Sequence, residues 1–85
     1  MKMKQEYKDD MMIDICTAMR AKLRARTSEE REVWWTQQDI ACELKASGGL
    51  AWQIICIGLT AGYFIARDGD MPKQKILVAL HPKLR

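Results

Sequence analysis

The chain has 85 residues, of which 14 are Lys or Arg and 11 are Asp or Glu, giving a net charge of +3 at pH 7. We expect these 85 residues to form one domain with a single core. The three cysteines, Cys16, Cys42 and Cys56, form no CxxC pair, and one histidine, His81, completes no zinc motif. An odd cysteine count without a signal-peptide pattern predicts a reducing, cytoplasmic location.

The residue pattern also argues against an enzyme. The sequence shows no nucleophile–base pair, phosphate-binding loop or metal cluster. Its paired acids have structural interpretations, because Asp9 and Asp10 suit a helix start, whereas Asp68 and Asp70 flank a turn glycine. We therefore expect no catalytic residue, metal, cofactor or small-molecule substrate.

Residues 1–8 are polar and are expected to form a flexible N-terminus. Asp9 or Asp10 is expected to cap a first helix that ends near Arg24. Its apolar residues recur at helical spacing and share one face: Met12, Ile15, Cys16, Met19 and Leu23. The C-terminal end of this helix is basic, with Arg20, Lys22, Arg24 and Arg26. These residues could contact phosphate, but the simpler explanation is that cations are favourable at the negative end of the helix dipole.

After a charged connector, residues 33–35 predict a short strand, with one of Trp34 and Trp35 facing the core and the other at a sheet edge or contact surface. Thr36 and Asp39 predict a capping box at the start of a second helix. Ile40, Ala41 and Leu44 share its apolar face, Lys45 falls in its last turn, and residues 46–49, with Gly48 and Gly49, predict the break. A third helix is expected from Leu50 to Ala61, ending at Gly62.

The C-terminal third predicts a β-hairpin. Residues 63–67 form the first expected strand, Asp68-Gly69-Asp70 the turn, and residues 73–80 the second strand. In the second strand Ile76, Val78 and Leu80 alternate on one face. We expect residues 9–82 to form the single domain and residues 83–85 a basic tail.

Residues 34–80 resemble the winged helix-turn-helix DNA-binding family in their order of residue types. The order is Thr36, Gln37, Gln38, Asp39-Ile40-Ala41, a glycine turn and then Leu59-Thr60-Ala61-Gly62-Tyr63-Phe64. In that family the second helix of the motif often ends Leu-x-x-Gly before an apolar strand, matched here by Leu59, Gly62 and Phe64. The resemblance implies an α+β fold, a small winged helix-turn-helix with three helices, a C-terminal hairpin wing and a short strand before the second helix.

The expected helix 50–61 is unusually apolar for a DNA-reading element. One side carries Trp52, Ile55, Cys56 and Leu59, and the opposite side carries Leu50, Ile54, Ile57 and Ala61. Only Gln53 and Thr60 are polar, and no basic residue occurs in it. A helix that is apolar all round is normally buried all round, which predicts that its outer face is covered by the first helix or a dimer mate, by a partner protein or by lipid.

Three functions follow, of which DNA binding ranks first. A dimeric transcription regulator would read bases with Gln53 and Thr60 and would contact phosphate with the remaining candidates: Gln37, Gln38, Lys45, Arg67, Lys73 and Lys75. The alternative is a phage- or plasmid-type inhibitor or adaptor, also expected to dimerise, that binds protein with Leu50, Trp52, Ile54, Ile57 and Ala61. The second alternative is a single-span membrane protein, because no charge lies between Lys45 and Arg67; the polar and turn residues in this stretch argue against it.

Overall fold

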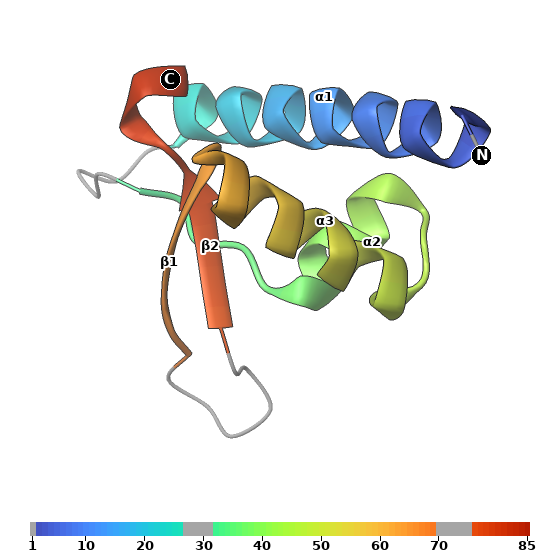
Figure 1. Cartoon of the computed structure of the whole chain (residues 1–85). Helices are drawn as coiled ribbons and strands as arrows, with labels where there is room; N and C mark the ends of the chain where they lie inside the picture. The colour runs from blue at the N-terminus through green and yellow to red at the C-terminus, as the bar shows by residue number, and fades with distance from the viewer. Residues whose placement is uncertain (1, 27–31, 70–75) are drawn as a thin grey trace.

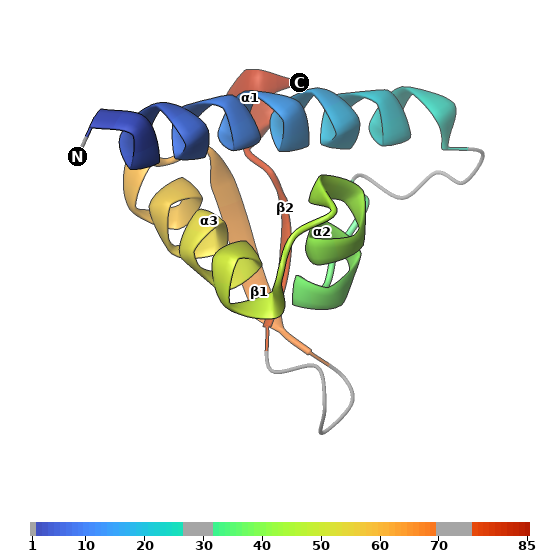
Figure 2. The same cartoon turned by 90° about the vertical axis from the view of Figure 1, so that its right-hand side faces the viewer.

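The computed structural model describes residues 2–26, 32–69 and 76–85. These residues form three helices, α1 (Lys2–Ala25), α2 (Gln37–Leu44) and α3 (Gly48–Ala61), then the strands β1 (Phe64–Asp68) and β2 (Ile76–Leu80) and a short 3-10 helix, η1 (Pro82–Leu84). Helix α1 lies across one side of the other elements, and the hairpin points away from it (Figures 1 and 2). This α+β arrangement is the layout expected of a small winged helix-turn-helix domain.

Helix α1 begins at Lys2, earlier than the start predicted at Asp9 or Asp10. The segment before Asp9 contains Lys, Met, Gln and Glu, which all favour helix, and neither Gly nor Pro to stop it. The predicted inward face is confirmed, because Met12, Ile15, Met19 and Leu23 are buried and Cys16 is half-buried. Met11 is buried as well and widens that face.

Strand β2 is central to the small sheet. It pairs with β1 in antiparallel register, from Phe64 opposite Leu80 to Asp68 opposite Ile76. On its other edge Trp35 and Val78 exchange two backbone hydrogen bonds of 2.7 and 2.9 Å. The strand predicted at residues 33–35 is therefore a single β-bridge. Residues 73–75, predicted to begin the second strand, lie outside the described residues.

The core lies between α1, the α2–α3 pair and β2. Its largest fully buried side chains come from all of these elements: Ile15, Met19, Ile40, Ile54, Ile55, Val78 and Leu80. Trp35 is the tryptophan that enters the core, as predicted for one of the pair, and Trp34 is only half-buried. Cys56, which belongs to one apolar side of the expected third helix, is exposed and is not part of the core.

The C-terminal residues fold back onto the end of α1 (Figure 1). The Arg20 side chain donates to the carbonyl oxygen of Leu84 at 3.0 Å. Arg85 donates to the carbonyl of Leu80 at 2.9 Å and pairs with the Glu32 carboxylate at 3.4 Å. The segment predicted as a basic tail, residues 83–85, is thus tied to the domain.

Within the described part of the chain, no single helix is both long and apolar enough to cross a membrane. Helices α2 and α3 reach that length and hydropathy only as a pair, and the pair is bent by 107° at the break between them. The uncharged stretch from Lys45 to Arg67 is therefore not one continuous helix.

Candidate nucleic-acid interface

The start of α2 is fixed by the predicted capping box. The Thr36 hydroxyl accepts a hydrogen bond from the Asp39 amide at 3.0 Å, and the Asp39 carboxylate accepts one from the Thr36 amide at 2.9 Å. Such reciprocal bonds satisfy two backbone donors that a helix leaves unpaired. The direction of α2 is thereby set by local sequence.

The turn between α2 and α3 differs from the prediction. Lys45 is not in the last helical turn but is the C-cap, with φ 53° and ψ 45° in the left-handed region. Ser47 is the N-cap of α3, and its hydroxyl accepts from the Leu50 amide at 3.1 Å. Because serine caps a helix well, Gly48 and Gly49 belong to the first turn of α3 rather than to the break.

The resulting connection is residues 45–47, and the two helices are bent by 107°. Helix-turn-helix motifs join two helices through a turn of about three or four residues at roughly 90–120°. Gln37, predicted to hold phosphate, instead donates from its side-chain amide to the Gly48 carbonyl at 2.6 Å and links the two helix starts. Gln38 is exposed, and its amide lies 3.5 Å from the Cys42 sulfur.

Helix α3 has one inward face and one outward face. Ala51, Ile54, Ile55 and Gly58 are buried at helical spacing. Ile54 is 0% exposed, so its predicted role at a protein interface is wrong. Among the other residues predicted for a protein interface, Leu50 is half-buried, whereas Ile57 and Ala61 are exposed.

The outward face is uncharged and largely small or polar along its middle. It is formed by Gln53, Cys56 and Thr60, with Trp52 on one flank at 43% exposure and Ile57 on the other at 38%. Both predicted base-reading residues, Gln53 and Thr60, are therefore on the accessible face of α3. The helix ends at Gly62, as predicted, in a left-handed conformation with φ 83°.

Arg67, one of the predicted phosphate contacts, lies near the end of β1, opposite Leu77. The Arg67 guanidinium lies 5.0 Å from the centre of the Trp34 ring, in a cation–π arrangement. This contact assigns the second tryptophan to the surface, where it supports β1. Lys73 and Lys75 lie outside the described residues, and Lys45 is exposed at the turn.

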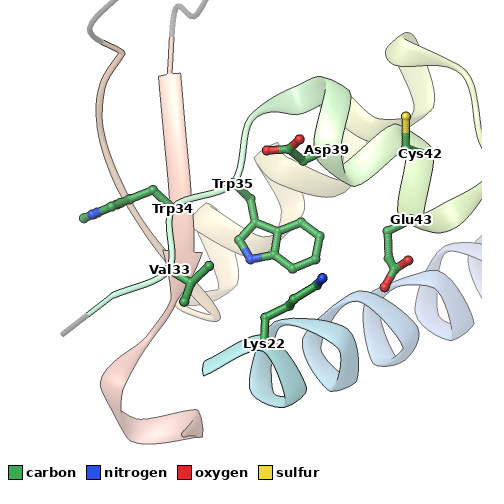
Figure 3. A pocket seen from close by; sticks show the side chains of 7 residues that line it. All are labelled: Lys22, Val33, Trp34, Trp35, Asp39, Cys42 and Glu43. Atoms are coloured by element: carbon green, nitrogen blue, oxygen red, sulfur yellow. The ribbon is translucent and has the colours of Figure 1, made fainter. Parts of the chain in front are cut away.

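A shallow pocket of about 470 Å³ separates α1 from α2 beside the tryptophan pair (Figure 3). The Trp35 ring points toward α1 and Trp34 points the opposite way. The Trp35 Nε1 is buried without a hydrogen-bond partner among the described residues. Charges of both signs line the pocket, Lys22 from α1 and Asp39 and Glu43 from α2, so it favours no anionic ligand.

Comparisons with protein-family models, with curated proteins and with solved structures found no match to this chain. The functional interpretation therefore rests on the geometry and chemistry of the α2–α3 pair and the hairpin.

Proposed function

We propose that this domain binds duplex DNA with the outward face of α3 in the major groove. The observation that carries the proposal is the α2–α3 geometry, a bend of 107° across a three-residue turn, with the middle of the second helix left accessible. Side chains of the second helix in such motifs reach base edges, and the surrounding elements contact the backbone.

Gln53 and Thr60 supply the hydrogen-bonding groups for base reading. A glutamine amide pairs in two places with adenine, and a threonine hydroxyl bonds to several base edges. Gly48 and Gly49 are exposed at the positive end of the α3 dipole, which favours a nearby phosphate. Lys45 at the turn precedes α3 in the sequence and Arg67 near the end of β1 follows it, and Lys73 and Lys75, which lie outside the described residues, come next in the chain.

Salt dependence tests the phosphate part of the proposal. If Lys45, Arg67, Lys73 and Lys75 each contact one phosphate, log K falls against log salt with a slope of about −3.6, and affinity drops roughly 10²-fold between 50 and 200 mM salt. Fluorescence anisotropy with labelled duplexes of mixed sequence measures this slope. No binding at 50 mM salt, or equal affinity at both concentrations, would contradict the proposal.

The second candidate function is protein binding through the same face. It is favoured by the large exposed fraction of Trp52 and by the absence of any cation in α3, since exposed tryptophans often anchor protein interfaces. Cys56→Arg separates the two functions without entering the core, because Cys56 is exposed. The added charge strengthens nonspecific DNA binding if α3 faces DNA, and it abolishes complex formation if α3 docks on a protein.

A further inference from the structure

A second apolar surface lies away from the α3 outward face. An open groove of about 700 Å³ runs between α1 and the C-terminal end of α3. Three of the four large apolar side chains that are exposed among the described residues line it: Ile13 at 63%, Tyr63 at 39% and Ile57 at 38%. Trp52, the fourth, does not line this groove.

The outward side of α1 beside this groove has a polarised charge pattern. Successive residues on that side lie at helical spacing, and we name them the α1 stripe: Asp9, Asp10, Ile13, Thr17, Arg20 and Arg24. Both acids are in its N-terminal half and both bases in its C-terminal half. Lys8 also lines the groove at the acidic end, where its single positive charge offsets one of the two acids and leaves that end net negative.

The middle of the α1 stripe is suited to a protein contact that excludes water. Ile13 is the most exposed large apolar side chain in the described residues. The Thr17 hydroxyl donates to the Ile13 carbonyl at 2.8 Å, so its hydrogen-bonding demand is met within the helix. Burial raises the pKa of the neighbouring Cys16 thiol more than Arg20 lowers it, which keeps this group neutral at pH 7.

We infer that this surface binds a second copy of the chain, with the two α1 helices packed antiparallel about a two-fold axis near Thr17, so that Asp10 of one copy faces Arg24 of the other. An antiparallel pair places the acidic half of each α1 stripe opposite the basic half of the other, whereas a parallel pair places like charges together. Charge complementarity with itself is what selects a second copy as the occupant. Ile13 then covers the apolar groove of its mate, which removes Ile57 and Tyr63 from water.

Molecular mass in solution tests this inference, with duplex DNA left out so that its outcome is independent of the proposed function. We expect a mass of about twice the 9.8 kDa of one chain by light scattering. Ile13→Glu should raise the dimer dissociation constant about tenfold or more, because it buries a charge at the centre of the contact. The matched control is Trp52→Glu, which changes an exposed apolar residue outside the groove and should leave the mass unchanged.

A charge exchange tests the antiparallel arrangement. Asp10→Arg and Arg24→Asp each place like charges together across the pair and should weaken the dimer, and the double variant should restore it. Arg20 is left intact in this series because it binds the Leu84 carbonyl. Thermal unfolding of each variant identifies any that fails to fold. A monomer at every concentration, a dimer broken by Trp52→Glu but not by Ile13→Glu, or no rescue in the double variant would overturn the inference.

Discussion

The two faces of α3 differ in what they contribute to the protein. The inward face, Ala51, Ile54, Ile55 and Gly58, is buried in the core, and a Cβ added at Gly58 would overlap the Phe64 ring. The outward face, with Gln53, Cys56 and Thr60 at its centre, is exposed. The inward side of this helix therefore contributes to stability, whereas the proposed DNA binding uses the outward side, and substitutions on the two faces should have separable effects.

The largest effect is expected at the centre of the inward face. Ile54→Ala removes buried methyl groups and leaves a cavity, which should lower the free energy of unfolding by about 2–5 kcal/mol. An 85-residue domain has roughly 4–13 kcal/mol in total, so the loss is severe. Urea unfolding followed by circular dichroism measures it. A loss no greater than that of Ile57→Ala would show that Ile54 is not the inward residue.

Gly58→Ala should have the next largest effect. A Cβ at Gly58 would overlap the Phe64 ring, and such overpacking costs about 1–3 kcal/mol. Gly49→Ala is the matched control in the same helix, because no atom lies within 4 Å of a Cβ there. In the control variant the free energy of unfolding should stay the same or rise by up to about 1 kcal/mol, because alanine has a better helix propensity than glycine. Equal effects of the two substitutions would refute the close contact between α3 and β1.

Ser47→Ala should lower stability by about 1 kcal/mol, because it removes the hydroxyl that accepts from the Leu50 amide. Ser47→Asp is the control that keeps an acceptor at the N-cap, and it should retain most of the stability. Thermal unfolding of the two variants measures the difference. If both variants lose the same stability, the cap does not define the start of α3.

The smallest change in stability is expected on the outward face. Gln53→Ala combined with Thr60→Ala should alter the unfolding free energy by no more than about 0.5 kcal/mol, since both side chains are exposed. The same double variant should lose about 1–3 kcal/mol of sequence discrimination for each residue that reads a base. Competition binding between a preferred and a scrambled duplex measures this difference in binding free energy. If the double variant discriminates between the two duplexes as well as the unmodified protein does, α3 is not the element that contacts the bases.

The sequence predicted the elements well where the signal was local. The capping box at Thr36 and Asp39, the α1 inward face and the glycine end of α3 all follow from neighbouring residues. Local sequence does not predict which side of α3 faces the core, because the helix is apolar on two sides and either side could be buried. Only packing against Phe64 and the core selects the side with Ile54 and Gly58.

The α2–α3 break was misplaced because Gly48-Gly49 is the stronger local signal, although Ser47 competes as an N-cap and prevails. The groove beside α1 was not foreseen either. It forms because Tyr63 and Leu84, distant from Ile13 in sequence, come together when the C-terminal residues fold back onto Arg20. That contact depends on the completed fold.

In the proposed function, DNA binds to the outward face of α3 and not to the α1 stripe. Amide chemical-shift mapping of the labelled protein during titration with duplex DNA at 50 mM salt tests it most directly. We predict that the largest shifts occur along α3 around Gly49, Gln53 and Thr60, and at Lys45 and Arg67, with α1 residues near Ile13 unchanged. Shifts confined to α1, or no shifts at all, would contradict the account.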